Sequence, residues 1–220
     1  SGRQRFASFS GGWHGRTLLA LLVTDDPSIC APYGEQLAEV QRLPFADLEA
    51  LEEVAWSELA AVIVEPVQSM AGIRTAPLAW FKRLAQLSRA HGCFLIFDEI
   101  QTGMGRLGHP FAADWLGIQP DFITLAKGIA SGVPMGAVLM SDAIGASLAP
   151  GDLGSTFGGG PLACAALLAT LRVIGEEQLV QRAASLGARF KQELPGPWID
   201  RVRGEGLLLG LQTRQPAARL

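Results

Sequence analysis

Two charged residues of opposite sign, Asp98 and Lys127, follow short apolar segments of this chain and are its first candidates for chemistry. Asp98 directly follows Cys93–Phe97, and Lys127 closely follows Phe122–Leu125. Apolar runs of four or five residues bounded by Gly and Pro are typical of strands buried on both faces of a parallel sheet. Because ligands of open α/β sheets bind beyond the carboxyl ends of the strands, we expect both charges at one site.

A lysine and a carboxylate at one site have a specific use, which is to bind pyridoxal 5'-phosphate. The lysine holds this cofactor as a Schiff base, and the carboxylate keeps its pyridinium nitrogen protonated, so that the ring accepts electrons from a substrate carbanion. An ordinary salt bridge at the rim of the sheet explains the same spacing, because charges at strand ends are common. The two residues alone leave both interpretations open.

The surrounding sequence predicts the strands that position these residues. A strand-like segment within Ser1–Ser10 precedes the turn GGWHGRT, where Trp13 either meets a flat partner or caps the core. Leu59–Val64 predicts a buried strand that ends at Glu65, and Thr75–Gly92 predicts an amphipathic helix before the strand that ends at Asp98. This alternation is the βαβ pattern of a parallel sheet, whose right-handed crossovers place the strand ends on one edge.

The remaining elements are predicted from composition and periodicity. Residues 25–34 are expected to form a loop, and 45–54 a short surface helix. A further strand is expected at 133–140, and a helix at 162–174 that is apolar nearly all round and therefore buried. An amphipathic helix at 178–194 and a strand at 206–211 complete the chain.

Two glycine-rich stretches resemble ligand-binding loops. Gly103, Gly105 and Gly108 spell GxGxxG, but no helix-forming stretch follows at once, so we expect a loop over the site and not a dinucleotide fingerprint. The second stretch, GDLGSTFGGGP, carries Ser155 and Thr156. Its backbone N–H groups and hydroxyls suit phosphate contacts, although such loops often only turn the chain.

Composition narrows the class of protein. Apolar residues make up 49% of the 220 and charged residues 18%, which is typical of a globular enzyme, and the net charge of −3 provides no nucleic-acid footprint. The longest apolar run, Leu162–Ala169, is far shorter than the roughly 20 residues of a membrane span. Three widely spaced cysteines and scattered histidines form no metal-ligand pattern. We expect a cytoplasmic enzyme without a secretory signal or metal.

Five stretches together resemble the class III, ornithine/acetylornithine-type, pyridoxal-phosphate aminotransferases. They are FSGGWHGRT, AVIVEPVQSMAGI, FLIFDEIQTGMGRLG, FITLAKGIASGVPMGAVL and GSTFGGGPLACAA, in the family's order. The resemblance implies a fold-type-I α/β large domain, with a mostly parallel sheet flanked by helices, over residues 1–171. Residues 172–220 would begin a small C-terminal α/β domain.

The resemblance also implies roles for individual residues. Lys127 looks like the Schiff-base lysine and Asp98 like the carboxylate on the pyridinium nitrogen. Gln101 resembles the side chain that approaches the cofactor's phenolic oxygen, and Trp13 occupies the aromatic position that stacks on the ring. Thr156, beside Ser155, resembles the residue that reaches the cofactor phosphate of the neighbouring subunit, which implies a homodimer.

Departures from the family pattern concern the substrate side. Glu65 matches the strand-end glutamate near the active site, but Met70 stands where many ornithine-type members carry a second glutamate. A thioether does not pair with a guanidinium, so specificity for ornithine or acetylornithine is open. Gly160 replaces the amide of the usual GGN in the phosphate loop.

The implied reaction moves an amino group from an amino-acid or ω-amine donor to a 2-oxo acid such as 2-oxoglutarate. An aminomutase, decarboxylase or epimerase on the same fold, and an inactive remnant that only binds or dimerises, are the alternatives. Family members are longer than this chain. We therefore expect it to lack an upstream phosphate-binding turn and a downstream carboxylate-binding arginine, and to show little or no turnover alone.

Overall fold

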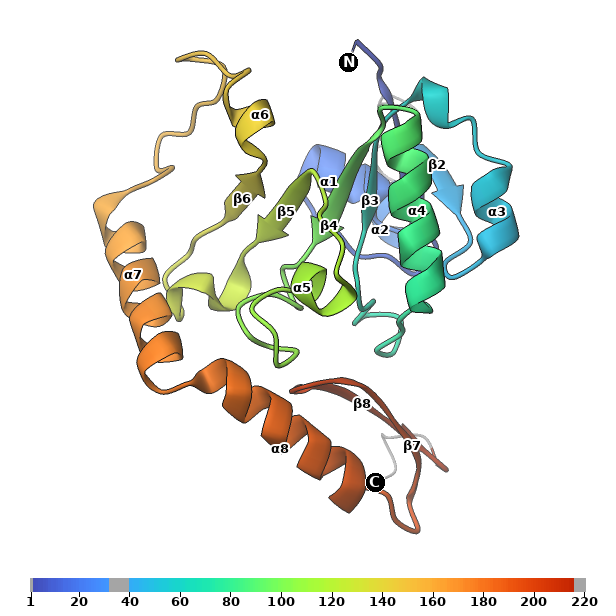
Figure 1. Ribbon diagram of the computed structural model, residues 1–220, viewed down its shortest axis with the longest axis vertical. Coiled ribbons are helices and arrows are strands. Elements are labelled where there is room, and N and C mark those ends of the chain that lie inside the picture. Colours follow the sequence, from blue (N-terminus) through green and yellow to red (C-terminus); the bar gives the residue numbers. More distant parts are fainter. Residues whose placement is uncertain (1, 32–39, 216–220) are drawn as a thin grey trace.

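The computed structural model describes residues 2–31 and 40–215 and is built around a six-stranded sheet (Figure 1). The strands lie in the order β2-β1-β3-β4-β5-β6; the first five are parallel, and β6 is antiparallel to β5. Their bounds are Arg5–Phe9 for β1, Val40–Leu43 for β2, Leu59–Val64 for β3, Phe94–Asp98 for β4, Phe122–Leu125 for β5 and Ala137–Met140 for β6. The carboxyl ends of β3, β4 and β5 therefore meet at one edge.

Helices cover both faces of the sheet beside its central strands (Figure 1). α4 (Leu78–Ala90) lies on one face, with α3 (Leu48–Glu52) packed beside it. α1 (Leu18–Val23) and α2 (Pro27–Cys30) lie on the opposite face, where α1 contacts β1 and β2. The central strands β3 and β4 are thus mostly buried, as is typical of strands covered on both faces of a parallel sheet.

The core between α4 and the sheet is aromatic. Trp80, Phe81 and Leu84 of α4 are fully buried, because their helical spacing directs them to one face. The Trp80 ring lies 4.9 Å from that of Phe9 on β1 and 5.0 Å from that of Phe81, in edge-to-face geometry. Pairs of this kind are worth about 0.5–1.5 kcal/mol beyond the area they bury. This side of the sheet therefore gives the strand ends a rigid base.

Short elements connect the larger ones. They are η2 (Trp56–Glu58), α5 (Ala112–Leu116), η3 (Lys127–Ala130) and α6 (Asp142–Gly145). The carboxylate of Glu99, directly after β4, accepts hydrogen bonds from the backbone N–H groups of Ala112 and Ala113 at 2.6 and 2.9 Å. This buried side chain therefore fixes the start of α5 against the end of β4.

The C-terminal part leaves the sheet through α7 (Pro161–Glu176) and continues as α8 (Leu179–Glu193). Gln178, between the two helices, has a left-handed backbone with φ of +51°. A separate antiparallel hairpin, β7 (Ile199–Glu205) and β8 (Leu208–Thr213), packs against α8 (Figure 1). The division into domains at residues 171 and 172 stays a prediction.

Close backbone approaches fix the hairpin. A Cβ placed on Gly187 of α8 would lie 2.1 Å from the carbonyl oxygen of Gly206, at the hairpin tip. Gly206 has φ of +51°, and a Cβ on it would lie 2.4 Å from the carbonyl carbon of Leu107. The backbone N–H of Leu207 also donates to the carbonyl of Arg106 at 2.9 Å. The tip of the hairpin is thus wedged between α8 and the loop that follows β4.

Most predicted elements are confirmed, and two predictions are wrong. The stretch 25–34 contains α2, which begins because the Asp26 carboxylate caps the N–H of Ser28 and Pro27 occupies the first turn; its residues 32–34 lie outside the described part. The helix predicted at 162–174 exists, but the described side chains of α7 are not buried. Leu162 and Leu168 are 74% and 64% exposed.

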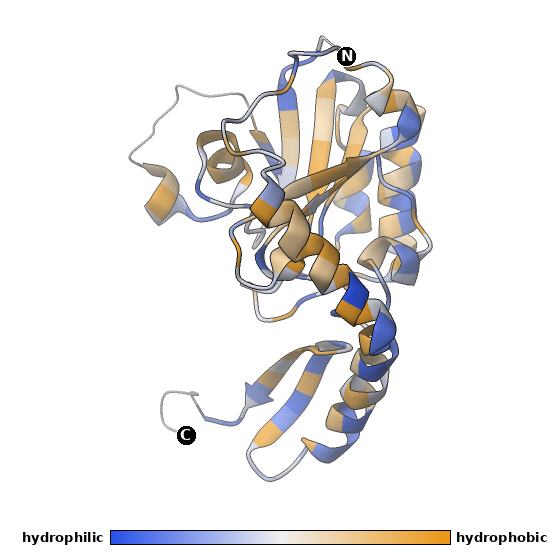
Figure 2. Cartoon of the chain, turned by 90° about the vertical axis from the view of Figure 1, so that its left-hand side faces the viewer, coloured by the Kyte–Doolittle hydropathy of each residue, from blue (hydrophilic) through white to orange (hydrophobic). Residues whose placement is uncertain are grey.

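The error over α7 has a physical reason. Its composition is that of a core helix, as the orange and pale residues around it show in Figure 2. Within the described chain its main contacts are with η3 and α8 alone. A helix that is apolar nearly all round favours burial, but the described residues cover only part of the surface of α7. None of the described helices is long and apolar enough to cross a membrane.

Candidate active site

Asp98 and Lys127 lie at the carboxyl edge of the sheet, on neighbouring parallel strands. Asp98 is the last residue of β4 and pairs in register with Thr124 of β5. Lys127 follows Thr124 by three positions and begins η3, directly beyond the end of β5. The backbone N–H of Glu99 donates to the carbonyl of Thr124 at 3.1 Å, which keeps the two strand ends together. The predicted convergence on one edge of the sheet is therefore observed.

The Asp98 carboxylate is buried and held at both oxygens. Its Oδ2 lies 2.7 Å from Nδ1 of His14, and the side chains of the pair are 4% and 2% exposed respectively. Its Oδ1 accepts from the backbone N–H of Ile100 at 3.2 Å and from the Thr124 hydroxyl at 3.3 Å. A buried carboxylate needs such partners, since an unpaired one costs several kcal/mol. The orientation of Asp98 is therefore fixed by the protein itself.

The turn after β1 delivers Trp13 and His14 across the end of β3. Gly11 has φ of +77°, and a Cβ on Gly12 would lie 2.9 Å from the carbonyl oxygen of Phe9 and 3.0 Å from His14 Nε2. Only glycine allows this backbone and this close approach by the imidazole. The turn then places the Trp13 N–H on Glu65, at the end of β3, while His14 reaches Asp98 at the end of β4.

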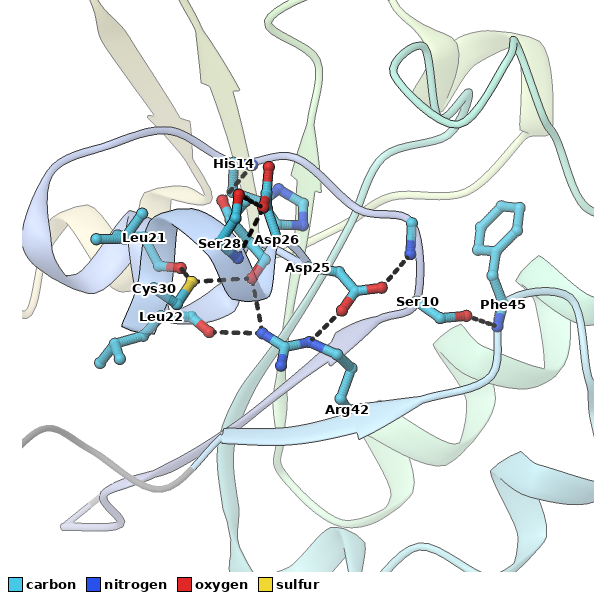
Figure 3. A network of polar contacts seen from close by, with 12 residues as sticks. Ser10, His14, Leu21, Leu22, Asp25, Asp26, Ser28, Cys30, Arg42 and Phe45 are labelled. Atoms are coloured by element: carbon cyan, nitrogen blue, oxygen red, sulfur yellow. Dashed lines mark hydrogen bonds and ion pairs between the residues drawn. The ribbon is translucent and has the colours of Figure 1, made fainter. Parts of the chain in front are cut away.

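A polar network anchors the same turn (Figure 3). The Asp25 carboxylate accepts from the backbone N–H of Gly11 at 2.8 Å and lies 3.3 Å from Nε of Arg42, on β2. Arg42 also donates to the carbonyls of Leu22 and Thr24, at 3.0 and 2.7 Å. One guanidinium thus ties the end of α1 and the glycine turn to β2.

Glu65 is a buried acid beside the Asp98–His14 pair. Burial raises its pKa to about 7, and the neighbouring Asp98 charge acts in the same direction. Hydrogen bonds from the backbone N–H groups of Trp13, at 2.8 Å, and of Ser69 oppose this rise in the pKa, as does His14. Its protonation therefore changes near neutral pH, a property typical of functional sites.

Gln101 and Lys127 line one cavity of about 1020 Å³, between the loop after β4, η3, α7 and α8. Gln101 Nε2 contacts the hydroxyl of Ser69. Lys127 is exposed and has a left-handed backbone, with φ of +52°. A non-glycine residue in this region costs roughly 1–3 kcal/mol and is enriched at functional sites. Lys127 is one of six described non-glycine residues with positive φ, and it shares the cavity with two of the others, Met104 and Ser131.

Other predicted site residues lie outside this cluster. Ser155 and Thr156 are exposed on the loop that leads to α7, and neither has a hydrogen bond to another candidate site residue among the described residues. Met70 is 66% exposed beyond the end of β3. Gly103 and Gly105 line the cavity, which agrees with the expectation of a loop over the site.

His14 is the site residue that the sequence analysis missed. In the sequence it is one of three scattered histidines without a metal-ligand pattern. Its role follows from the strand order, which only the structure shows: β1 lies beside β3, and β3 beside β4, so the turn after β1 crosses β3 and arrives at Asp98.

The family comparison agrees with this geometry. The model of the family described as aminotransferase class-III matches residues 1–219. This chain belongs to the class-III aminotransferase family. Curated relatives include the acetylornithine aminotransferases of Methanopyrus kandleri, 41% identical over 215 residues, and Archaeoglobus fulgidus, 43% identical over 217 residues. These alignments cover 96% and 99% of the chain but 55% and 58% of the relatives.

Solved structures of similar proteins confirm the fold class of this class-III aminotransferase chain. An ornithine aminotransferase from Toxoplasma gondii superposes with a TM-score of 0.89 at 34% identity, covering 100% of the chain and 53% of that structure. An omega-transaminase from Thermomicrobium roseum gives 0.88 at 31% identity, covering 99% and 55%. The predicted mostly parallel sheet flanked by helices is that of these transaminases. The chain spans about half of their length.

Proposed function

We propose that this chain forms the cofactor-binding part of a pyridoxal-phosphate-dependent aminotransferase. The reaction moves an amino group from an amino-acid or ω-amine donor, ornithine-like or acetylornithine-like, to a 2-oxo acid such as 2-oxoglutarate. The observation that carries the proposal is the buried Asp98–His14 pair at the end of β4, beside the strand that leads to Lys127. Membership of a family whose curated relatives are named acetylornithine aminotransferases supports it.

The residues at the strand ends fit pyridoxal 5'-phosphate. Lys127 would hold it covalently, Asp98 would pair with its pyridinium nitrogen, and Gln101 would meet its phenolic oxygen. The half-buried indole of Trp13 would lie against the ring. When bound, the cofactor supplies an electron sink for the negative charge that develops at the substrate Cα.

Different groups of the protein would orient the cofactor and transfer the proton. Asp98 keeps its position because His14, Thr124 and the Ile100 N–H hold both carboxylate oxygens. Such preorganisation means that little rearrangement accompanies charge development. Lys127 Nζ, when not bonded to the cofactor, would accept the proton from the substrate Cα, which requires that it lie within hydrogen-bond reach of that atom.

The substrate side is proposed to include Glu65 and Met70. Glu65 lies behind Trp13, whose backbone N–H it accepts, and is neutral for part of the time near pH 7. Met70 presents an exposed thioether on the turn after β3. Because a thioether does not pair with a guanidinium, Met70 does not fill the role of the second glutamate that many ornithine-type members carry there.

Two other functions fit parts of the same site. An aminomutase or decarboxylase would use the same Asp98 and Lys127, and an assay for 2-oxoglutarate-dependent loss of the donor amine separates these from transamination. A non-catalytic remnant that binds or dimerises would fold without taking up the cofactor. The 220-residue chain by itself is expected to show little or no turnover; an ordinary rate would contradict that expectation.

The decisive test is covalent capture of the cofactor. The purified chain mixed with pyridoxal phosphate should give a yellow absorbance band that borohydride fixes onto Lys127. Lys127→Ala and Lys127→Arg should both lose the band, because one removes the amine and the other replaces it by a guanidinium that does not deprotonate. Lys82→Ala, an exposed lysine on α4, is the matched control and should keep it. No band on folded wild-type chain contradicts the proposal and favours the remnant.

We further propose a homodimer in which the exposed loop carrying Ser155 and Thr156 reaches the cofactor phosphate of the neighbouring subunit. Both residues are exposed, and this loop leads into α7, whose apolar side chains are also exposed. Burial of these apolar side chains against a second copy would remove them from water.

We also propose a cytoplasmic location. The cytoplasm is a reducing compartment, which suits three free cysteines, of which Cys93 is buried.

A further inference from the structure

Ser69 lies where three turns of the active-site edge meet. Its backbone N–H lowers the pKa of Glu65, and Glu65 also accepts the backbone N–H of Trp13 at 2.8 Å. Its hydroxyl contacts Nε2 of Gln101, on the turn after β4. One residue therefore connects the turn after β3 with the turns after β1 and β4.

The turn that carries Ser69 is closed and anchored, so its hydroxyl has a defined position. Gln68 and Arg74 exchange two backbone hydrogen bonds of 2.7 and 3.0 Å across the base of the turn. The carbonyl of Ser69 accepts from the N–H of Gly72 at 3.2 Å. The Gln68 side chain donates to the carbonyl of Ser10 at 2.9 Å, which ties this turn to the one bearing Trp13.

Gln101, in contrast, depends on Ser69 for its orientation. Among residues 2–31 and 40–215, Ser69 is the hydrogen-bond partner of the Gln101 side chain, and Gln101 lines the same cavity as Lys127. A glutamine amide nitrogen carries two protons. With one of them directed to the Ser69 hydroxyl, the plane of the amide is set and the other remains for an acceptor in the cavity.

We propose that Ser69 is a positioning residue that orients the amide of Gln101 toward an anionic oxygen of the bound ligand. The inference rests on the proposed function, in which that oxygen is the phenolic oxygen of pyridoxal phosphate. Ser69 itself acts through Gln101 and does not touch the ligand.

The first experiment is a double-mutant cycle read out as the dissociation constant of pyridoxal phosphate, titrated by absorbance on the 220-residue chain. Ser69→Ala should weaken binding about 3- to 10-fold, since one oriented hydrogen bond is worth that order. It should have no further effect in a Gln101→Ala background, because contacting residues that act as a unit are non-additive. Ser69→Thr keeps the hydroxyl and should restore most of the affinity.

The control is Ser88→Ala, which removes a buried hydroxyl of α4 that donates within its own helix to the carbonyl of Ala85 at 3.1 Å. It should leave the dissociation constant unchanged. Equal effects of Ser69→Ala with and without Gln101 would overturn the inference while leaving the proposed function intact. Failure of wild-type chain to bind the cofactor at all would instead contradict the proposed function.

A second experiment needs no cofactor. In ¹⁵N-labelled chain, Ser69→Ala should shift the side-chain amide resonances of Gln101 and speed their exchange with solvent, whereas Ser88→Ala should not. These resonances are assigned by their loss in Gln101→Ala. If Ser69→Ala leaves them unmoved, Ser69 does not hold Gln101, and the inference is overturned whatever the cofactor titration shows.

Discussion

At the scale of residues, two consecutive residues of one turn form hydrogen bonds with the ends of two different strands. The Trp13 N–H rests on Glu65 after β3, and the His14 imidazole on Asp98 at the end of β4. A turn of this kind sets the distance between an aromatic ring and a carboxylate without any ligand. The face and the nitrogen edge of a flat, charged ring would therefore meet groups that are held by the same turn.

The raised pKa of Glu65 predicts a pH-dependent stability. Between its ordinary pKa of 4.5 and its folded value of about 7, the folded chain binds more protons than the unfolded chain. The free energy of unfolding therefore falls as the pH rises through this window. Glu65→Gln removes the titration. Relative to wild type, its free energy of unfolding should rise by about 1–3 kcal/mol between pH 5 and pH 8.

Urea unfolding at pH 5, 6, 7 and 8 measures this difference. It should level off above pH 8, where Glu65 is ionised in both states. If the difference in free energy of unfolding between Glu65→Gln and wild type stays constant over the whole pH range, burial does not raise the pKa of Glu65.

The candidate site was predictable where residue type and strand position coincide. Asp98 and Lys127 each follow an apolar run of strand length, so the sheet edge could be inferred from the sequence alone. The hydrogen bond between His14 and Asp98 could not, because it depends on the spatial order β1-β3-β4, which the chain order does not give. The role of Ser69 escaped for the same reason, since Ser69 lies in the turn after β3 and Gln101 in the turn after β4.

At the scale of elements, strands with a continuous apolar run were predictable from the sequence, and strands rich in polar residues were not. The bounds of β3 and β5 agree with the predicted segments. β2 and β7 were missed because VQRL and IDRVRGE are rich in polar residues and half exposed. They are strands because a neighbour offers them a ladder of backbone hydrogen bonds, a tertiary effect that outweighs local propensity.

The close approach at Gly187 gives a prediction at this scale. Alanine normally stabilises a helix interior relative to glycine by about 1 kcal/mol, yet a Cβ here would lie 2.1 Å from the Gly206 carbonyl oxygen. We expect Gly187→Ala to destabilise the packing of the hairpin on α8 by about 1–3 kcal/mol. Faster tryptic cleavage within β7 and a lower urea midpoint would report it.

Gly175→Ala is the matched control for this experiment. Gly175 is also helical, in α7, but a Cβ added to it meets nothing within 4 Å. The control should be neutral or slightly stabilising. Equal behaviour of the two variants would mean that the hairpin does not press on α8.

At the scale of the whole molecule, the protein is well covered on one side and open on the other. The core between the sheet and α4 is dense, while α7 and β6 expose Leu162, Leu168, Val138 and Leu139. The chain spans about half the length of its curated relatives. The homodimer proposed above would bury this exposed apolar surface.

The proposed homodimer predicts the effect of charges on α7. Leu168→Lys combined with Leu171→Lys should lower the self-association constant at least tenfold, measured by sedimentation velocity, because both apolar side chains are exposed on α7. Leu78→Lys, a comparably exposed leucine at the start of α4, should leave it unchanged. A wild-type chain that stays monomeric at tens of micromolar would contradict the proposed dimer through this helix.

The wedged tip of the β7–β8 hairpin limits how the molecule can move. The Leu207 N–H is bonded to Arg106, five residues beyond Gln101 in the same loop. If the hairpin swings away as a lid, it must either break this bond or drag the loop with it. Because Leu207 and Leu208 themselves line the cavity that contains Lys127, any movement of the hairpin tip would change the wall of that cavity directly.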